Sequence, residues 1–295
     1  MATTPPLLAE TAAARALRED VVLSTGNTAL WRYPAQQPSR GTILFIHGYR
    51  GNHHGLEAIA GALPDFDVLI PDLPGFGLSA PFKHRHSIVA YTGWLTELVA
   101  KLQLQDAIIL GHSFGTIITA AAAAKGLANR LVLVNPVSSF KRTGVEQTLK
   151  QLTDIYYGVG GALPEKGGNY ILKNPVFVRL MSEVLTKTKN KKLRNWIHQQ
   201  HNSNFSEFAE RRVALEGYLA STSRSVAAYA PKIQNDVLLI VGELDDITKL
   251  ADQQRVLRLF PNAQFEVIRG VGHLVHYETP SQAATLVREF SLTDD

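Results

Sequence analysis

Short runs of apolar residues recur along the chain without the polar alternation that a half-exposed strand shows. Continuous runs of this kind are typical of strands in a parallel sheet that helices cover on both faces. The runs are Thr42–Ile46, Val68–Ile70, Ala107–Leu110, Leu131–Val134, Val237–Val241 and Phe265–Ile268. Helical patterns lie between or after them, at Ser87–Leu104, Phe114–Leu127, Thr248–Phe260 and Ser281–Phe290. This alternation predicts an α/β fold with a doubly wound, mostly parallel sheet.

An antiparallel hairpin is expected ahead of these strands. Val21–Ser24 and Ala29–Tyr33 are short strand-like segments on either side of the turn Thr25-Gly26-Asn27. With this hairpin, the sheet is expected to hold eight strands with helices on both faces.

The alternation stops between Pro136 and Pro231. This stretch has no clear buried-strand run, and it is rich in aromatic residues, glycines and helical segments. The sequence therefore predicts a core made of residues 1–136 and 231–295, with a mostly helical insertion over residues 137–230.

Composition excludes several classes of protein. The chain has no cysteine, which excludes disulfides, Cys-ligated zinc and a thiol nucleophile. A net charge of +4 over 295 residues is too small to indicate a basic surface that binds nucleic acid. No apolar run approaches the ~18 residues that a membrane span needs. The first twenty residues lack a basic leader and a long apolar core and contain Glu10, so we expect no signal peptide and a cytoplasmic location.

A candidate nucleophile lies in Gly111-His112-Ser113-Phe114-Gly115, which matches G-x-S-x-G. The motif follows the run Ala107–Leu110 directly and opens an Ala-rich helix, which is the strand–turn–helix setting that it needs. The turn is expected to hold Ser113 in a strained conformation, and a Cβ at either flanking glycine would crowd the neighbouring strand or helix.

A serine hydroxyl becomes a good nucleophile only when a base removes its proton. The candidate base is His273, in the glycine-rich loop after the last expected strand. Three acids after the preceding strand could orient the imidazole, and we favour Asp245 over Asp246 and Glu243. The order Ser113, Asp245, His273 is the one expected of α/β-hydrolases.

Five motifs together resemble the α/β-hydrolase superfamily, and in particular its lidded alpha/beta hydrolase fold-1 members. They are His47-Gly48, Asp72–Ser79, Gly111–Gly115, Gly242–Asp245 and Gly272-His273, and the match covers about Val21–Pro136 and Pro231–Phe290. The resemblance implies an α/β-hydrolase fold whose helical insertion is a cap over the site.

Two backbone N–H groups are needed to stabilise the oxyanion of an acyl-transfer reaction. One is expected from Phe114, directly after the nucleophile, and the resemblance assigns the other to Tyr49. The resemblance also implies that His47 braces this loop, and we count His47 and Arg50 as tentative substrate-binding residues. Asp72 is expected to hold its own loop by local hydrogen bonds, and His276 is expected to pack at a helix start.

The leading hypothesis is a serine hydrolase that cleaves a small-molecule carboxylic ester through an acyl-enzyme, without cofactor or metal. Ser113 disfavours relatives such as epoxide hydrolases, which carry an aspartate there. A cofactor-free lyase and a carbon–carbon bond hydrolase on the same fold stay open, because Arg50 could pair with a substrate carboxylate. A non-catalytic binding role is the least favoured alternative. The sequence assigns no role to His53 and His54 and leaves the oligomeric state open.

Overall fold

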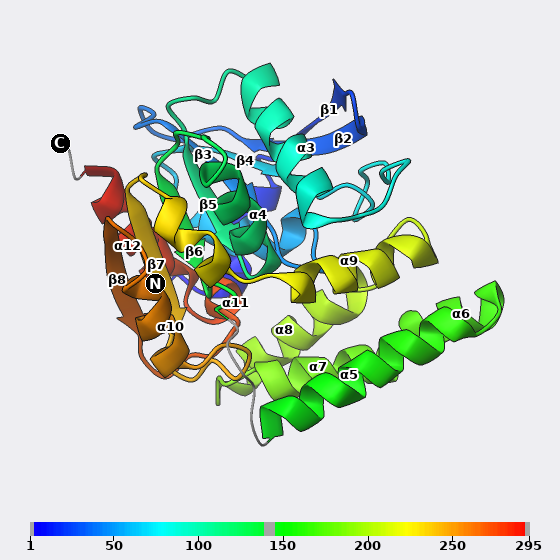
Figure 1. Cartoon of the computed structure of the whole chain (residues 1–295). Helices are drawn as coiled ribbons and strands as arrows, with labels where there is room; N and C mark the ends of the chain where they lie inside the picture. Colours follow the sequence, from blue (N-terminus) through cyan, green and yellow to red (C-terminus); the bar gives the residue numbers. More distant parts are fainter. Residues whose placement is uncertain (1–2, 139–144, 293–295) are drawn as a thin grey trace.

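The computed structural model describes residues 3–138 and 145–292, with the backbone alone for 145–150. Within them, eight strands form one sheet in the order β1-β2-β4-β3-β5-β6-β7-β8 (Figure 1). The strands are β1 Leu17–Leu23, β2 Gly26–Tyr33, β3 Thr42–Ile46, β4 Asp67–Pro71, β5 Ile108–His112, β6 Leu131–Val134, β7 Val237–Gly242 and β8 Ala263–Ile268. The hairpin β1–β2 and the pair β2–β4 are antiparallel, and all other pairs are parallel. The predicted mostly parallel, eight-stranded sheet is therefore confirmed.

The helices are α1 Pro5–Ala13, α2 Glu57–Gly61, α3 Ile88–Lys101, α4 Phe114–Ala123, α5 Val145–Ala162, α6 Glu165–Leu172, α7 Pro175–Leu185, α8 Lys191–Asn204, α9 Arg211–Ser223, α10 Leu250–Leu257, α11 Val275–Glu278 and α12 Pro280–Leu292. Three short 3₁₀ helices lie at His53–Leu56, Val226–Ala228 and Ala230–Lys232. The helix expected to reach Leu127 ends at Ala123, and Gly126 follows in the left-handed region at φ 105°.

Alternate side chains of the central strands enter two separate cores. Leu44 and Ile46 of β3 pack in the cluster that includes α3 and α4, whereas Ile43 and Phe45 pack in the cluster that includes α2 and α12. Successive side chains of a strand point to opposite faces, so a strand covered on both faces must be apolar at every position. This is the physical reason for the continuous apolar runs in the sequence.

The strand order reverses direction at β3, and this reversal positions the candidate site. From β3 the chain moves to β4 on one side, and β5 then pairs with β3 on its other side. The loops after β3 and β5 therefore leave the carboxyl edge of the sheet beside each other. In open α/β sheets, ligands bind at such a switch point.

Helices α5–α9, which we call the cap helices, lie between β6 and β7 in the sequence and group together on one side of the molecule in Figure 1. No helix among the described residues has both the length and the apolar character to cross a bilayer.

Candidate active site

A pocket of about 290 Å³ opens where the cap helices meet the loops after β3 and β5. The core contributes both polar and apolar groups, among them His47, Tyr49, His112, Ser113, Phe114, Ile247, His273 and His276. The cap contributes mainly apolar and aromatic groups, among them Tyr157, Phe177, Met181, Val184, Leu185, His201, Phe205 and Tyr218. The lining is mostly apolar, as is usual for small-molecule sites, and its polar side chains come from both the core and the cap, where they include Thr153, Gln200, Asn204, Ser221 and Thr222.

Ser113 stands at a sharp turn between β5 and α4. Its backbone has φ 52° and ψ −115°, a strained region for a residue with a side chain. A Cβ on Gly115 would lie 2.0 Å from the Ile46 carbonyl oxygen, and one on Gly111 would lie 2.7 Å from the Gly115 carbonyl oxygen. Both glycines are therefore required by close backbone approach, as the sequence predicted.

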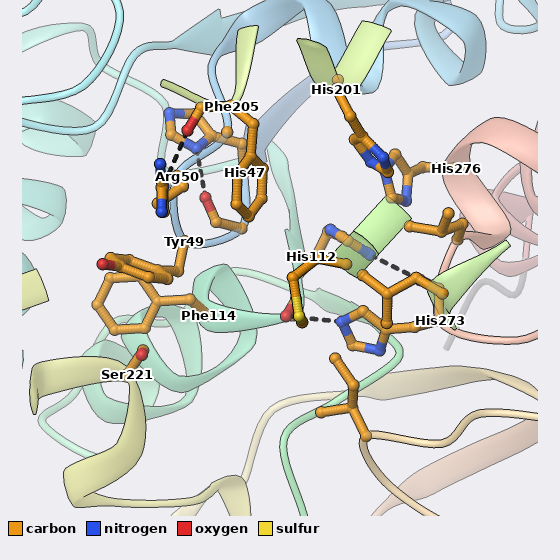
Figure 2. A pocket seen from close by; sticks show the side chains of 18 of the residues that line it. His47, Tyr49, Arg50, His112, Phe114, His201, Phe205, Ser221, His273 and His276 are labelled. Atoms are coloured by element: carbon orange, nitrogen blue, oxygen red, sulfur yellow. Dashed lines mark hydrogen bonds between the residues drawn. The ribbon is translucent and has the colours of Figure 1, made fainter. Parts of the chain in front are cut away.

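The imidazole of His273 joins Ser113 to Asp245. Nε2 of His273 lies 2.9 Å from Ser113 Oγ, a contact marked by the dashed line at His273 in Figure 2. Nδ1 of His273 lies 2.9 Å from Asp245 Oδ2. His273 is in the loop between β8 and α11, whereas Asp245 follows β7. Three loops distant in the sequence thus bring the three side chains together at one edge of the sheet.

The Asp245 carboxylate is buried and held by several donors. Oδ1 accepts from the backbone N–H of Ile247 at 2.8 Å, and Oδ2 accepts from Asn135 Nδ2 at 2.8 Å. Burial alone would raise the pKa of Asp245, but the facing His273 and these hydrogen bonds outweigh it and lower the pKa. The carboxylate therefore stays ionised and holds Nδ1 of His273 as the protonated nitrogen.

Neither alternative acid contacts the imidazole. The side chain of Asp246 is 51% exposed and pairs with Lys187 of the cap. The carboxylate of Glu243 is exposed and accepts from the Gly270 backbone N–H at 2.9 Å.

Two backbone N–H groups in the loops after β3 and β5 have no acceptor among the described residues. Phe114 is the first residue of α4, so its N–H has no partner within the helix. The N–H of Tyr49 has no acceptor among the described residues. The Tyr49 ring packs edge-on against Phe76 and Phe114, and its hydroxyl donates to the Ala214 carbonyl of α9. These contacts fix the loop that carries the N–H.

His47 braces this loop rather than facing open space. Its Nε2 accepts from the backbone N–H of Leu73 at 2.8 Å, so Nδ1 carries the proton and donates to the Gly48 carbonyl at 2.8 Å. Burial lowers the pKa of His47 to about 4, so the ring is neutral near pH 7. Both ring nitrogens of His47 are therefore engaged in hydrogen bonds. A substrate that contacts His47 would have to displace one of them, and this contact stays a prediction.

Arg50 connects the same loop to the cap. Its guanidinium is buried and donates to the carbonyls of Phe205 at 2.9 Å and Leu172 at 2.6 Å, and to the Tyr157 hydroxyl at 3.2 Å. It also stacks 4.6 Å from the centre of the Phe205 ring. A substrate carboxylate at Arg50 would compete with these contacts, so that role also stays a prediction.

His53 and His54 lie outside the pocket lining. The ring of His53 stacks on Trp31 and contacts Asp72 Oδ1 at 2.9 Å, whereas His54 contacts Glu57 Oε2 at 3.0 Å. The side chains of His53, His54 and Glu57 offer atoms that could bind a metal within 4.8 Å of one another. The hydrogen bonds of His53 to Asp72 and of His54 to Glu57 account for this clustering without a metal.

The expected role of Asp72 is confirmed. Its carboxylate accepts from the backbone N–H groups of His53 at 2.8 Å and Leu78 at 3.0 Å, which ties two loops together.

Sequence reasoning missed two neighbours of the site. Asn135 follows β6 in the left-handed region, at φ 48°, and no recognised motif marks it. His112 precedes the serine, and its Nε2 donates to the His273 carbonyl across 3.3 Å. Burial and the neighbouring His273 lower the pKa of His112 to about 3, so it holds the histidine loop as a neutral ring.

Comparison with known proteins identifies the family of the chain. Residues 41–280 match the model of the alpha/beta hydrolase fold family. Lipase 1 of Psychrobacter immobilis is 26% identical over 254 residues, which cover 84% of this chain and 76% of the lipase. An uncharacterized hydrolase of Bacillus subtilis, YugF, is 27% identical over 266 residues, which cover 86% of this chain and 91% of that protein.

A solved structure shows the same fold. It is a thermophilic esterase from Thermogutta terrifontis, with 21% identity and a TM-score of 0.70 over 93% of this chain and 97% of the esterase. The fold, the motif order and the family match agree, and the chain therefore belongs to the alpha/beta hydrolase fold family.

Proposed function

We propose that this protein is a serine hydrolase that cleaves carboxylic esters through an acyl-enzyme, with Ser113, His273 and Asp245 as its catalytic triad. The hydrogen-bonded chain from Ser113 Oγ through His273 to Asp245, at the wall of an apolar pocket, is the observation that carries the proposal. The relatives named as a lipase and an esterase support ester cleavage.

The geometry supports an ordered acyl transfer. His273 Nε2 takes the proton of Ser113 Oγ as the oxygen attacks the ester carbonyl, and Asp245 stabilises the resulting imidazolium. The backbone N–H groups of Tyr49 and Phe114 donate to the oxyanion, and each such donor is typically worth ~10²–10³ in rate. His273 then gives its proton to the departing alcohol, and water releases the acid by the same steps.

The cap helices would enclose the substrate. We place the cap at residues 137–230, between β6 and β7, with the α/β-hydrolase core at residues 1–136 and 231–295. Phe177, Met181 and Leu185 line the pocket from α7. These apolar side chains favour an acyl group without charge, and the volume of about 290 Å³ favours a small ester.

Hydrolysis of p-nitrophenyl esters from acetate to decanoate tests the proposal. We expect native protein to turn over at least one chain length, with a preference for those that fit the pocket. Ser113→Ala should lose all but the background rate while its thermal unfolding stays cooperative. Absence of turnover at every chain length would reject ester hydrolysis and favour the lyase or carbon–carbon bond reactions that the fold also supports.

A further inference from the structure

Two histidines form a polar patch in the apolar pocket, beyond the triad. His201 comes from cap helix α8 and His276 from α11, and both line the pocket. Figure 2 shows them with His112 on the same side as His273, whereas Tyr49 and Phe114 lie on the other side. The ring centres of His112 and His276 are 4.0 Å apart, and those of His112 and His273 are 5.4 Å apart.

A chain of polar side chains inside the cap holds the His201 ring in place. Nδ1 of His201 and Nδ1 of His198 both contact Ser182 Oγ, at 2.7 Å and 2.6 Å. His198 Nε2 lies 3.3 Å from a Glu183 oxygen, which is an ion-pair distance rather than a well-aligned hydrogen bond. All three members Ser182, His198 and His201 are buried.

One hydroxyl proton cannot serve both rings. One of the two histidines therefore accepts from the Ser182 hydroxyl, and the other donates from Nδ1 to Ser182 Oγ. In either arrangement Nε2 of a neutral His201 is left to accept or donate one hydrogen bond. No partner is assigned to this nitrogen among the described residues.

Both pocket histidines are neutral near pH 7. Burial and the neighbouring His198 lower the pKa of His201 to about 4, and burial together with His112 and His201 lowers the pKa of His276 well below its usual value. Nδ1 of His276 is buried and has no hydrogen-bond partner among the described residues. Because this nitrogen is closed off from solvent, a ligand in the pocket cannot reach it, and the hydrogen-bonding group of this patch is Nε2 of His201.

The patch lies on the same side of the pocket as His273. In acyl transfer, the leaving oxygen must lie near His273 Nε2 to receive its proton, and the oxyanion lies on the side of the two backbone N–H donors. His201 and His276 are on the His273 side of the pocket. A group attached to the leaving alcohol would therefore point toward their side of the pocket.

We propose that His201 and His276 form a subsite for a free hydroxyl on the alcohol part of the substrate, so that the enzyme prefers monoesters of diols or polyols. This inference rests on the proposed ester hydrolysis. Nε2 of His201 forms a hydrogen bond with the substrate hydroxyl, which can either donate or accept, and the neutral ring of His276 lies beside it in the pocket lining. Ser182 and His198 act through His201 and are positioning residues.

Matched pairs of butanoate esters test the subsite. Propyl butanoate is compared with 2-hydroxyethyl butanoate, and butyl butanoate with 3-hydroxypropyl butanoate, so that a terminal methyl is replaced by a hydroxyl in each pair. Released acid is titrated at constant pH to give kcat/KM. We expect native enzyme to prefer the hydroxy ester in at least one pair.

Substitutions then identify the groups responsible. In His201→Phe, the ratio of kcat/KM for the hydroxy ester to that for its partner should fall about tenfold, the size of one neutral hydrogen bond. Ser182→Ala removes only one hydroxyl and leaves His201 in place without orientation, so the ratio should fall about threefold. Gln199→Leu, an exposed position of the same helix, should keep the native ratio.

Equal kcat/KM within both pairs for native enzyme, or the native ratio in both His201→Phe and Ser182→Ala, would overturn the subsite while leaving ester hydrolysis standing. Failure of native enzyme to turn over any of the four esters and any p-nitrophenyl ester would instead reject the proposed function, and this inference with it.

Discussion

The side-chain amide of Asn135 donates a hydrogen bond to Asp245 Oδ2 across 2.8 Å, the same carboxylate oxygen that faces His273 Nδ1. A second contact, 3.3 Å to the Gly272 carbonyl, ties the amide to the loop that carries the histidine. Asn135 is fully buried at the end of β6. One amide thus joins the acid and the base of the proposed triad to the central sheet.

Replacement of Asn135 by alanine should slow catalysis. A hydrogen bond to a buried charge is worth about 1.5–3 kcal/mol, so Asn135→Ala should reduce kcat about ten- to hundredfold on any ester that the native enzyme cleaves. Asn235→Ala is a matched control, because its amide donates to the Leu127 and Asn129 carbonyls away from the site. A native kcat in Asn135→Ala would show that Asp245 needs no such support.

The identity of the orienting acid can be tested by two neighbouring substitutions. Asp245→Asn should lower kcat roughly 10³- to 10⁴-fold, because the amide no longer holds the imidazole in the required tautomer. Asp246→Asn should change kcat less than about threefold, since this half-exposed side chain contacts Lys187 and not His273. Steady-state kinetics of both variants decide the assignment, and the reverse pattern would move the role to Asp246.

The strands of the core and the turn that carries Ser113 could be anticipated because local rules determine them. Continuous apolar runs identify strands buried on both faces, and Gly111 and Gly115 are required by backbone contacts within the turn itself. Asp245 and His273 follow strands whose carboxyl ends share one edge. The preference for Asp245 rested on loop position alone, and the structure adds its burial and hydrogen bonds.

Contacts between the cap and the core were not accessible from sequence. Arg50 pairs with Leu172 and Phe205, which are more than a hundred residues away, and no periodicity or motif encodes such a partner. The hydrogen-bonded chain Ser182–His198–His201 could not be predicted either. Its members lie on two helices, and their spacing in the sequence is that of any two packed helices. Tertiary packing, rather than local propensity, decides these contacts.

Removal of the Arg50 guanidinium should loosen the cap. Arg50→Met leaves the Phe205 carbonyl without its donor and removes one of the two donors to the Leu172 carbonyl, which should cost about 2–4 kcal/mol in the free energy of unfolding. Arg50→Lys keeps the charge but not the fork of donors, so it should recover only part of this loss. The exposed Arg18, replaced by methionine, should change stability by less than about 0.5 kcal/mol.

Urea unfolding of these variants measures the free energies, and limited proteolysis shows which part opens. We expect earlier cleavage within residues 151–210 in Arg50→Met than in native protein. Native stability together with native resistance to protease would contradict the anchoring role of Arg50.

Several buried histidines should make the fold sensitive to acid. Burial lowers the pKa of His47 and His201 to about 4 and that of His112 to about 3, whereas a histidine in the unfolded chain titrates near 6.5. Between these values the unfolded chain binds protons that the folded chain does not. Stability should therefore be fully present above pH 6.5 and fall as the pH drops toward 4.

Urea midpoints at pH 7.5 and pH 5.0 measure this effect. Each such histidine should contribute about 2 kcal/mol to the difference, since about 1.36 kcal/mol is lost for each pH unit below 6.5. The difference should shrink in His201→Phe, which removes one of these groups. Equal midpoints at the two pH values would show that the rings are protonated in the folded protein or hydrated within it.

The central claim is that the imidazole of residue 273 makes the hydroxyl of residue 113 nucleophilic. Mass spectrometry after exposure to an alkyl fluorophosphonate tests it most directly, because the reagent phosphonylates only an activated serine. We predict a single adduct on the native chain, located at Ser113 by peptide sequencing, with no adduct on Ser113→Ala and a rate at least a thousandfold lower for His273→Ala. An unlabelled native chain, or labelling at the native rate without His273, would contradict the claim.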